Sequence, residues 1–296
     1  MSRSLREDDA MSNITLTLLS HAPLNHMNVL DVGGNKSYIN HGLLRHDLET
    51  TLVPQITDTL KNLSSSSKDM LQLAVSGFIL PLLKKYAPET LNELQSFVQT
   101  KNVALLAVPY YGTSLHILSD NALQEQLNLE TDALNKFFKK RANGFFSADG
   151  LVPKNCSYDQ IFVGKKVTGE VALSTLAENV IATPTIAMGN EVTPKTEFSE
   201  MEQHLLTEYQ ALTPHVLATE DSDLLTEWHL LGQHEMFTKA DALTHLHESY
   251  DHYATYMNVL NDIAHKIKTV ELGKQGLFAT QPDIVASPAS LLQEFR

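Results

Sequence analysis

Nearly continuous apolar segments alternate with amphipathic segments along the first half of the chain. The apolar runs lie at residues 14–20, 71–80, 103–108 and 144–148. Such runs are typical of strands covered on both faces, as in a parallel sheet. Apolar side chains recur at helical spacing in the segments between them, at residues 48–63, 88–99 and 121–140. This alternation predicts an α/β fold built on a parallel sheet, with Pro54 as a kink in the first helix.

Polar or aromatic residues follow the predicted strands where each strand ends. His21, the pair Tyr110 and Tyr111, and Asp149 occupy these places. Parallel α/β folds carry their chemistry at the carboxyl ends of the strands, so we expect a site there. The sequence contains neither GxGxxG nor GxxxxGK, the phosphate-binding turns of many doubly wound sheets. A barrel is therefore favoured over a doubly wound sheet.

The second half of the chain carries weaker signals. Residues 180–188 predict a strand interrupted by its proline, and Ser199 with Glu202 predicts a capped helix. A strand at residues 216–218 or 224–225 is expected to lead into the segment TEWHLLGQH. The site would then include that segment.

The segment TEWHLLGQH, residues 226–234, holds several chemically useful side chains. Glu227 can give or take a proton, and Trp228, the single tryptophan of the chain, offers an apolar ring face. His229 and His234 add imidazoles. An indole beside a carboxylate and imidazoles suits a site that holds a sugar ring while protons move. The alternative is a polar loop in which Trp228 serves core packing.

Composition excludes several classes of partner. The formal net charge is −13, which repels nucleic acid and anionic membranes and favours a neutral or cationic substrate. Cys156 is the single cysteine, so an internal disulfide and a cysteine-based zinc site are excluded, and neither a metal nor a cofactor is expected. No apolar run approaches the length of about 18 residues that a membrane span needs. We expect residues 1–12 to form a disordered tail of a cytoplasmic protein.

Segments in a fixed order resemble glycoside hydrolase family 57, the family of α-amylases and 4-α-glucanotransferases. They are LLSHAP at 18–23, the stretch 71–111 ending in VPYY, GFFSADGLV at 144–152, TEWHLLGQH at 226–234 and VASPASLLQEF at 285–295. LLSHAP is similar to the family's HQP motif, and the stretch 71–111 is similar to its SG strand with the following YYH strand. GFFSADGLV is similar to the segment that carries the family's nucleophile, and TEWHLLGQH is similar to DYETFGEH. VASPASLLQEF is similar to the family's threonine–proline–serine–glutamate segment.

The resemblance implies one (β/α)7 barrel, an incomplete TIM-like barrel, over residues 13–296. It also implies a retaining enzyme that acts on an α-glucan or maltodextrin, as a glycoside hydrolase or a 4-α-glucanotransferase. Asp149 stands at the nucleophile position and Glu227 at the acid/base position. The residues that the resemblance places around the substrate are His21, Tyr110, Tyr111, Trp228, His229 and His234. The sequence carries no signal for the oligomeric state.

Several positions depart from the family pattern. The two acids are exchanged in type, since Asp149 replaces a glutamate and Glu227 replaces an aspartate, and Ala104 and His229 replace two family glutamates. The changes at Ala104 and His229 remove polar groups that should tighten on a transition state. Three interpretations therefore stay open: a hydrolase or transglycosylase with exchanged acids, a degenerate member that binds glucan or a protein partner without turnover, and a barrel that uses its histidines for different chemistry.

Overall fold

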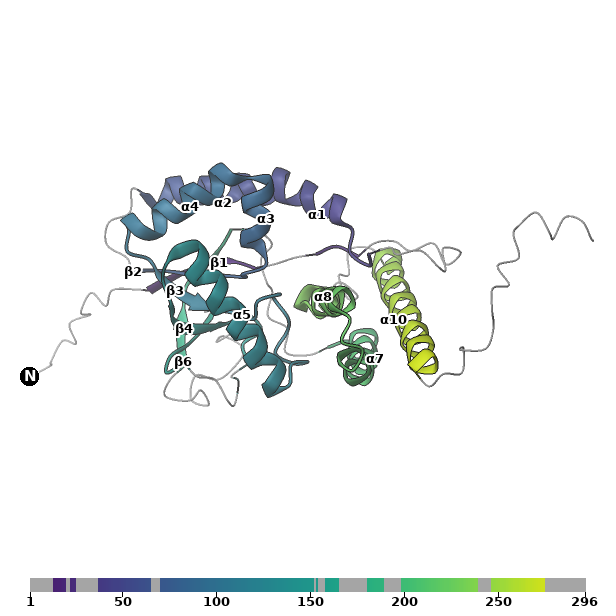
Figure 1. Cartoon of the computed structure of the whole chain (residues 1–296). Coiled ribbons are helices and arrows are strands. Elements are labelled where there is room, and N and C mark those ends of the chain that lie inside the picture. Colours follow the sequence, from purple (N-terminus) through teal and green to yellow (C-terminus); the bar gives the residue numbers. More distant parts are fainter. Residues whose placement is uncertain are drawn as a thin grey trace, which may run out of the picture.

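The computed structural model gives the chain an α/β region followed by a helical region (Figure 1). It describes residues 13–19, 22–24, 37–64, 70–151, 153, 158–164, 180–188, 198–238 and 246–274. The tail predicted at residues 1–12 and the segment VASPASLLQEF lie outside the described residues. Among the helices that the structure describes, none is both long and apolar enough to cross a bilayer.

Among the residues that the structure describes, the sheet has seven strands, and every pair of neighbours is parallel. The strands are β1 (Asn13–Leu18), β2 (Met70–Val75), β3 (Ala104–Ala107), β4 (Ala142–Ser147), β5 (Ile161–Gly164), β6 (Val180–Thr183) and β7 (Thr185–Ala187). Their order is β6-β5-β4-β3-β2-β1-β7. Pro184 alone separates the two outer strands in the sequence, so the sheet curls until its edges meet there. The predicted incomplete TIM-like α/β barrel is confirmed.

Pro184 marks a change of pairing partner within one extended segment. β6 pairs with β5, whereas β7 pairs with β1. Proline has no N–H to donate to a ladder, while the Pro184 carbonyl accepts a hydrogen bond from the Thr15 N–H at 2.9 Å. The predicted strand with an interruption at its proline is thus confirmed. Because β7 follows β6 directly, the seven strands are not each followed by a helix.

Helices of the first half cover the strands on the outside (Figure 1). They are α1 (His41–Asp47), the π-helical turn η1 (Leu48–Leu52), α2 (Val53–Ser64), α3 (Ile79–Tyr86), α4 (Pro88–Thr100) and α5 (Asp120–Phe138). Fully buried leucines from α3, α4 and α5 share one core with Leu73 of β2. Each such side chain contributes about 1.5–3 kcal/mol through its burial. A π-helical turn ends just before Pro54, the position where a kink is predicted.

A second core lies among the later helices, beside the barrel (Figure 1). These helices are α7 (Glu200–Leu217), α8 (Ser222–Leu231), α9 (His234–Thr238) and α10 (Leu246–Lys274). Side chains from the N-terminal part, Tyr38 and Ile39 among them, complete this core. The Tyr38 hydroxyl also donates to Asp262 Oδ2 of α10 at 2.8 Å. The N-terminal segment therefore connects the barrel to the helical region.

The long apolar run at residues 71–80 was wrongly predicted as one strand. β2 ends at Val75, and the chain turns at Ser76 and Gly77 before α3 begins at Ile79. The Ser76 N–H donates to the Leu18 carbonyl, and the Gly77 N–H donates to the Glu130 carboxylate. The end of the run is apolar because it forms the buried face of α3, a pattern that a strand would share.

The strand predicted at residues 216–218 or 224–225 is also wrong, because both segments are helical. Asp221 caps α8, and its side chain accepts hydrogen bonds from the backbone N–H groups of Asp223 and Leu224. The cap starts a helix that continues through Leu231. Most of TEWHLLGQH therefore lies on a helix instead of at the end of a strand. By contrast, the predicted capping box of Ser199 and Glu202 is confirmed at the start of α7.

Candidate functional site

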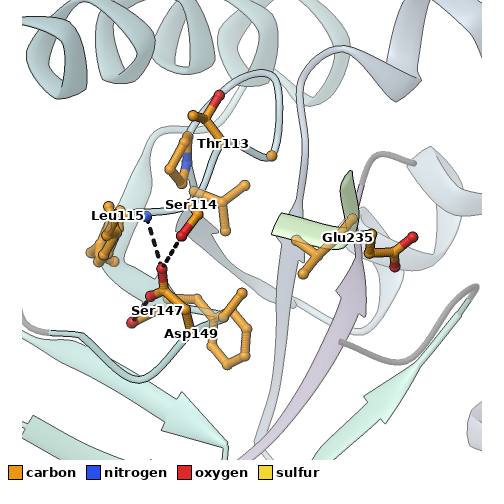
Figure 2. Close-up of a pocket in the computed structure, with 13 residues that line it drawn as sticks. Thr113, Ser114, Leu115, Ser147, Asp149 and Glu235 are labelled. Carbon is orange, nitrogen blue, oxygen red and sulfur yellow. Dashed lines mark hydrogen bonds between the residues drawn. The ribbon is translucent and has the colours of Figure 1, made fainter. Parts of the chain in front are cut away.

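A pocket lies at the carboxyl ends of β1, β3 and β4, where parallel α/β folds place their sites (Figure 2). Apolar and polar side chains both line it. They are Leu19, Val108, Pro109, Gly112, Thr113, Ser114, Leu115, Phe145, Phe146, Ser147, Ala148, Asp149 and Glu235. The acidic residues that line this pocket are Asp149 and Glu235.

Asp149 is buried, with 7% of its surface exposed, and the surrounding fold hydrogen-bonds both of its oxygens. Oδ2 accepts from the Ser114 hydroxyl at 3.1 Å and from the Leu115 N–H at 2.7 Å, as the dashed lines in Figure 2 show. Oδ1 accepts from the Ser147 hydroxyl at 3.1 Å and from the Leu151 N–H at 3.4 Å. A carboxylate has about four lone-pair sites, so these donors occupy its acceptor capacity.

Glu235 is the pocket carboxylate that sequence reasoning missed. It lies in the first turn of α9, across the pocket from Asp149, with its carboxylate turned away from that residue (Figure 2). Gln233 anchors the start of α9, because its side chain accepts from the Ala22 N–H at 2.7 Å and donates to the Tyr111 carbonyl at 2.9 Å. The available signal was its position directly after TEWHLLGQH.

Phe78, Tyr110, Tyr111 and His229 form a continuous group of half-buried rings, called the aromatic cluster below. The Tyr111 ring stacks on the His229 ring at 5.1 Å with an interplanar angle of 7°. Tyr110 and Phe78 contact Tyr111 at 4.8 Å and 5.7 Å between ring centroids. Burial raises the pKa of Tyr110 to about 12 and also raises the pKa of Tyr111, so both hydroxyls keep their hydrogens.

Gln126 of α5 joins His229 to the loop that carries the tyrosines. Its side-chain oxygen accepts from the Tyr111 N–H at 3.2 Å, and its amide nitrogen donates to the Thr113 hydroxyl at 2.9 Å. The same nitrogen lies 3.4 Å from His229 Nδ1. Burial lowers the pKa of His229, and the opposing effect of Glu125 is smaller. The imidazole is therefore neutral at pH 7, which suits a ring stacked on tyrosine.

Gly232 brings the end of α8 close to this loop. A Cβ atom at Gly232 would lie 2.6 Å from the Tyr209 hydroxyl and 3.1 Å from the Thr113 methyl carbon, so a larger residue would clash. The Ser114 N–H donates to the Gly232 carbonyl at 3.2 Å. This close contact sets the position of His229, which lies on α8 about one helical turn before Gly232.

Glu227 does not line the pocket, although it lies on the same helix as His229. Its Oε1 accepts the hydroxyl hydrogen of Ser37 and lies 3.9 Å from His41 Nε2. Its Oε2 is buried and has no hydrogen-bond partner in the part of the chain that the structure describes. The two predicted catalytic carboxylates thus face different surroundings.

Trp228 lies inside the helical core, with 1% of its surface exposed. Its indole stacks on Tyr209 at 4.1 Å with an interplanar angle of 7°, and the Tyr209 hydroxyl donates to the Trp228 carbonyl. This is the packing position that the sequence left open as an alternative. His21 and the side chain of His234 lie outside what the structure describes.

The structure therefore brings together Tyr110, Tyr111 and His229 and places Asp149 in the adjoining pocket. Glu227 and Trp228 point elsewhere. Across the described ranges, no group of three or more His, Cys, Asp or Glu side chains could hold a metal ion.

Comparisons with known proteins identify one family. Residues 15–161 match the model of glycosyl hydrolase family 57, a span that includes Asp149 and the tyrosine pair but not TEWHLLGQH. No curated protein matches. Similar solved structures include a 4-α-glucanotransferase from Thermococcus litoralis, with 14% identity, a TM-score of 0.42 and coverage of 59% of this chain and 28% of that chain. A GH57 branching enzyme from Thermococcus kodakaraensis has 10% identity and a TM-score of 0.37, with coverage of 97% of this chain and 72% of that chain.

Proposed function

The chain belongs to glycosyl hydrolase family 57 through residues 15–161, and we propose that it binds an α-glucan at the aromatic cluster and the adjoining pocket without cleaving it. One observation carries the proposal. The loop from Pro109 to Leu115 presents the tyrosine rings on one side and holds Asp149 by hydrogen bonds on the other. The first feature favours sugar binding, and the second disfavours turnover.

The aromatic cluster has the chemistry that glucose units require. The C–H faces of a sugar ring pack on aromatic rings, and Tyr111 with His229 supplies adjacent half-buried rings. Tyr110 and Tyr111 keep their hydroxyl hydrogens because burial raises the pKa of both, so they can donate to sugar oxygens. A neutral glucan also suits a chain with a net charge of −13.

The carboxylates argue against cleavage of the glycosidic bond. A retaining mechanism needs two carboxyl groups about 5–5.5 Å apart, one of which attacks the anomeric carbon. The acceptor sites of Asp149 are engaged by four donors, so the attack would first have to break those bonds. Glu227 is bound to Ser37 and does not line the pocket that holds Asp149. Both features support binding without turnover.

Calorimetry with maltoheptaose, amylose and glycogen tests the proposal together with an assay for new reducing ends. We expect saturable binding without release of reducing ends. Tyr111→Ala should weaken binding by about tenfold, because stacking contributes about 0.5–1.5 kcal/mol beyond the buried area. Tyr250→Ala is the matched control, since Tyr250 is 62% exposed on α10 and lies outside the aromatic cluster. Equal affinities of the two variants would disprove binding at the cluster.

Turnover by Glu227 is the second candidate, and its Oε2 atom favours it. A buried carboxylate oxygen without a partner is costly and occurs often at functional sites. If Glu227 acts as the general acid, reducing ends or redistributed chain lengths should form from maltoheptaose and should disappear in Glu227→Gln. Their formation would reject the proposal of binding alone.

A further inference from the structure

Ser37, His41 and Glu227 form a cluster outside the pocket, where the predicted acid/base residue meets two side chains that the sequence did not connect to it. The Ser37 hydroxyl donates to Glu227 Oε1. Ser37 Oγ also lies 3.1 Å from His41 Nε2, and His41 Nε2 lies 3.9 Å from Glu227 Oε1. A hydroxyl, a carboxylate and an imidazole lie within 3.9 Å of one another here, and these are the groups from which a nucleophile and its base are built.

The single hydroxyl hydrogen of Ser37 fixes the direction of these contacts. The acceptors that it can reach include Glu227 Oε1, the Ile39 carbonyl at 3.1 Å and, in one tautomer, His41 Nε2 at 3.1 Å, and the carboxylate is the strongest of these. The hydrogen therefore points to Glu227. The Ile39 N–H donates to Ser37 Oγ at 3.1 Å, and His41 Nε2, at 3.1 Å from the same oxygen, donates to it in only one tautomer, so in the other tautomer one lone pair of Oγ is open for attack.

Glu227 is a suitable base for this hydroxyl. Its side chain is only 16% exposed, so the charge of the carboxylate is poorly screened by water where it meets Ser37. When Glu227 takes the hydrogen, the remaining serine oxygen faces the donor on Ile39. A hydroxyl is a weak nucleophile by itself, and a base in hydrogen-bond contact with it is the arrangement that activates it.

The backbone that follows Ser37 is held by two sets of contacts. The Tyr38 hydroxyl donates to Asp262 and accepts from Lys266 Nζ, which connects the segment to α10. Asn40 caps α1 through the Leu43 N–H at 3.0 Å, and this cap positions His41 at the first residue of the helix. Ser37 and His41 therefore keep their relative placement without a ligand.

We propose that Ser37 is an activated nucleophile, with Glu227 as its general base, that is acylated by small uncharged esters. Access comes from the side of His41, whose side chain is 61% exposed. Glu227 lies beside Ser37 and the net charge of the chain is −13, so anionic esters are repelled. This activity goes beyond glucan binding and does not depend on it.

The reaction uses the ester and water alone. Ser37 Oγ bonds to the carbonyl carbon of the ester as its hydrogen passes to Glu227. The bond between that carbon and the alcohol oxygen breaks, and Glu227 returns the hydrogen to the departing alcohol. Water then attacks the acyl-serine with Glu227 as base, the acid leaves, and Ser37 regains its hydrogen.

Incubation with p-nitrophenyl acetate, followed by peptide mass spectrometry, tests the proposal. We expect acetyl-Ser37, with an initial burst of p-nitrophenol release at the same rate as the label appears. Glu227→Gln should slow acylation about a hundredfold, the usual size of a general-base effect, because glutamine still accepts the Ser37 hydrogen bond but cannot take its hydrogen. His41→Gln should slow it less. Ser119, an exposed serine at the start of α5, is the internal reference and should stay unlabelled.

Two results would overturn the proposal: absence of label on Ser37 in the folded wild-type chain, or equal labelling rates in the wild type and in Glu227→Gln. Circular dichroism and thermal unfolding of each variant check that slow labelling does not reflect a lost fold. Maltoheptaose binding measured on Ser37→Ala separates the two proposals. This variant should bind as the wild type does, so a failure of acylation leaves glucan binding untouched, and a failure of binding leaves acylation untouched.

Discussion

The pocket loop and helix α8 each present a carboxylate that the family resemblance marks as catalytic, but the two carboxylates have opposite surroundings. Asp149 beside the loop accepts four hydrogen bonds from its own fold. Glu227 on α8 binds one hydroxyl through Oε1 and leaves Oε2 buried and unpaired within the described part of the chain. The comparison teaches that a motif position does not fix a chemical role, because the neighbours decide whether a carboxylate stabilises the fold or reacts.

The largest expected effect is a difference between these two residues in how much stability the protein loses when each is substituted. Asp149→Asn should lower the free energy of unfolding by about 3 kcal/mol, because an amide cannot accept from all four donors and leaves buried donors unsatisfied. Glu227→Gln should lower it by less than about 1 kcal/mol, since glutamine keeps the one bond from Ser37. Urea unfolding of both variants measures the difference, and equal losses would break the comparison.

Local signals in the sequence were sufficient to predict much of the barrel. The apolar runs of β1, β3 and β4 and the spacing of α4 and α5 depend on nearby residues, and the structure has each of them. The capping box of Ser199 and Glu202 was also readable, because it is a contact between residues three positions apart. The strand predicted at residues 216–218 or 224–225 rested on three or two apolar residues, which is too short a pattern to tell a strand from a helix, and the cap at Asp221 marks the start of α8.

The site was less predictable because its contacts join distant parts of the chain. Strand ends pointed to Tyr110, Tyr111 and Asp149, but the stacking of His229 on Tyr111 depends on the packing of α8 against the loop. The contact between Ser37 and Glu227 joins residues 190 positions apart, and no local sequence pattern predicts it. Nor does any local pattern show that the hydrogen-bonding capacity of Asp149 is used by its neighbours. The role of each predicted catalytic residue stays a prediction until the variants are measured.

Glu130 extends the comparison to a third carboxyl group, buried in α5 with one oxygen bonded to the Gly77 N–H at 2.8 Å. Burial raises its pKa well above the ordinary value, and the Gly77 hydrogen bond opposes this only in part. The folded state therefore keeps the proton after the unfolded state has lost it. Stability from this group is complete below the unfolded pKa of about 4.3 and declines as the pH rises toward the folded pKa.

Glu130→Gln removes this dependence while keeping an acceptor for Gly77. Relative to the wild type, the variant should gain up to about 1.4 kcal/mol of stability per pH unit between pH 5 and the folded pKa of Glu130. Urea unfolding at pH 5, 6 and 7 checks the slope, with Glu227→Gln as the carboxylate control. If the free energies of unfolding of Glu130→Gln and of the wild type differ by the same amount at every pH, Glu130 is ionised in the folded state. The three carboxyl groups would then differ only in the hydrogen bonds that they make.

The smallest expected effect concerns His229, which joins α8 to the pocket loop. Burial lowers its pKa, so the unfolded chain takes up a proton at a higher pH than the folded chain does. The stability that His229 contributes is complete above the unfolded pKa of about 6.5 and is lost as the pH falls toward the folded pKa. As the pH falls from 6.5 toward the folded pKa, the wild type should lose more stability than His229→Gln, by at most about 1.4 kcal/mol per pH unit. Nuclear magnetic resonance titration of the imidazole provides the direct check. A pKa above 6.5 would mean that the ring is protonated against Tyr111, and the aromatic cluster would then carry a charge on the side of the loop where a neutral sugar is expected to bind.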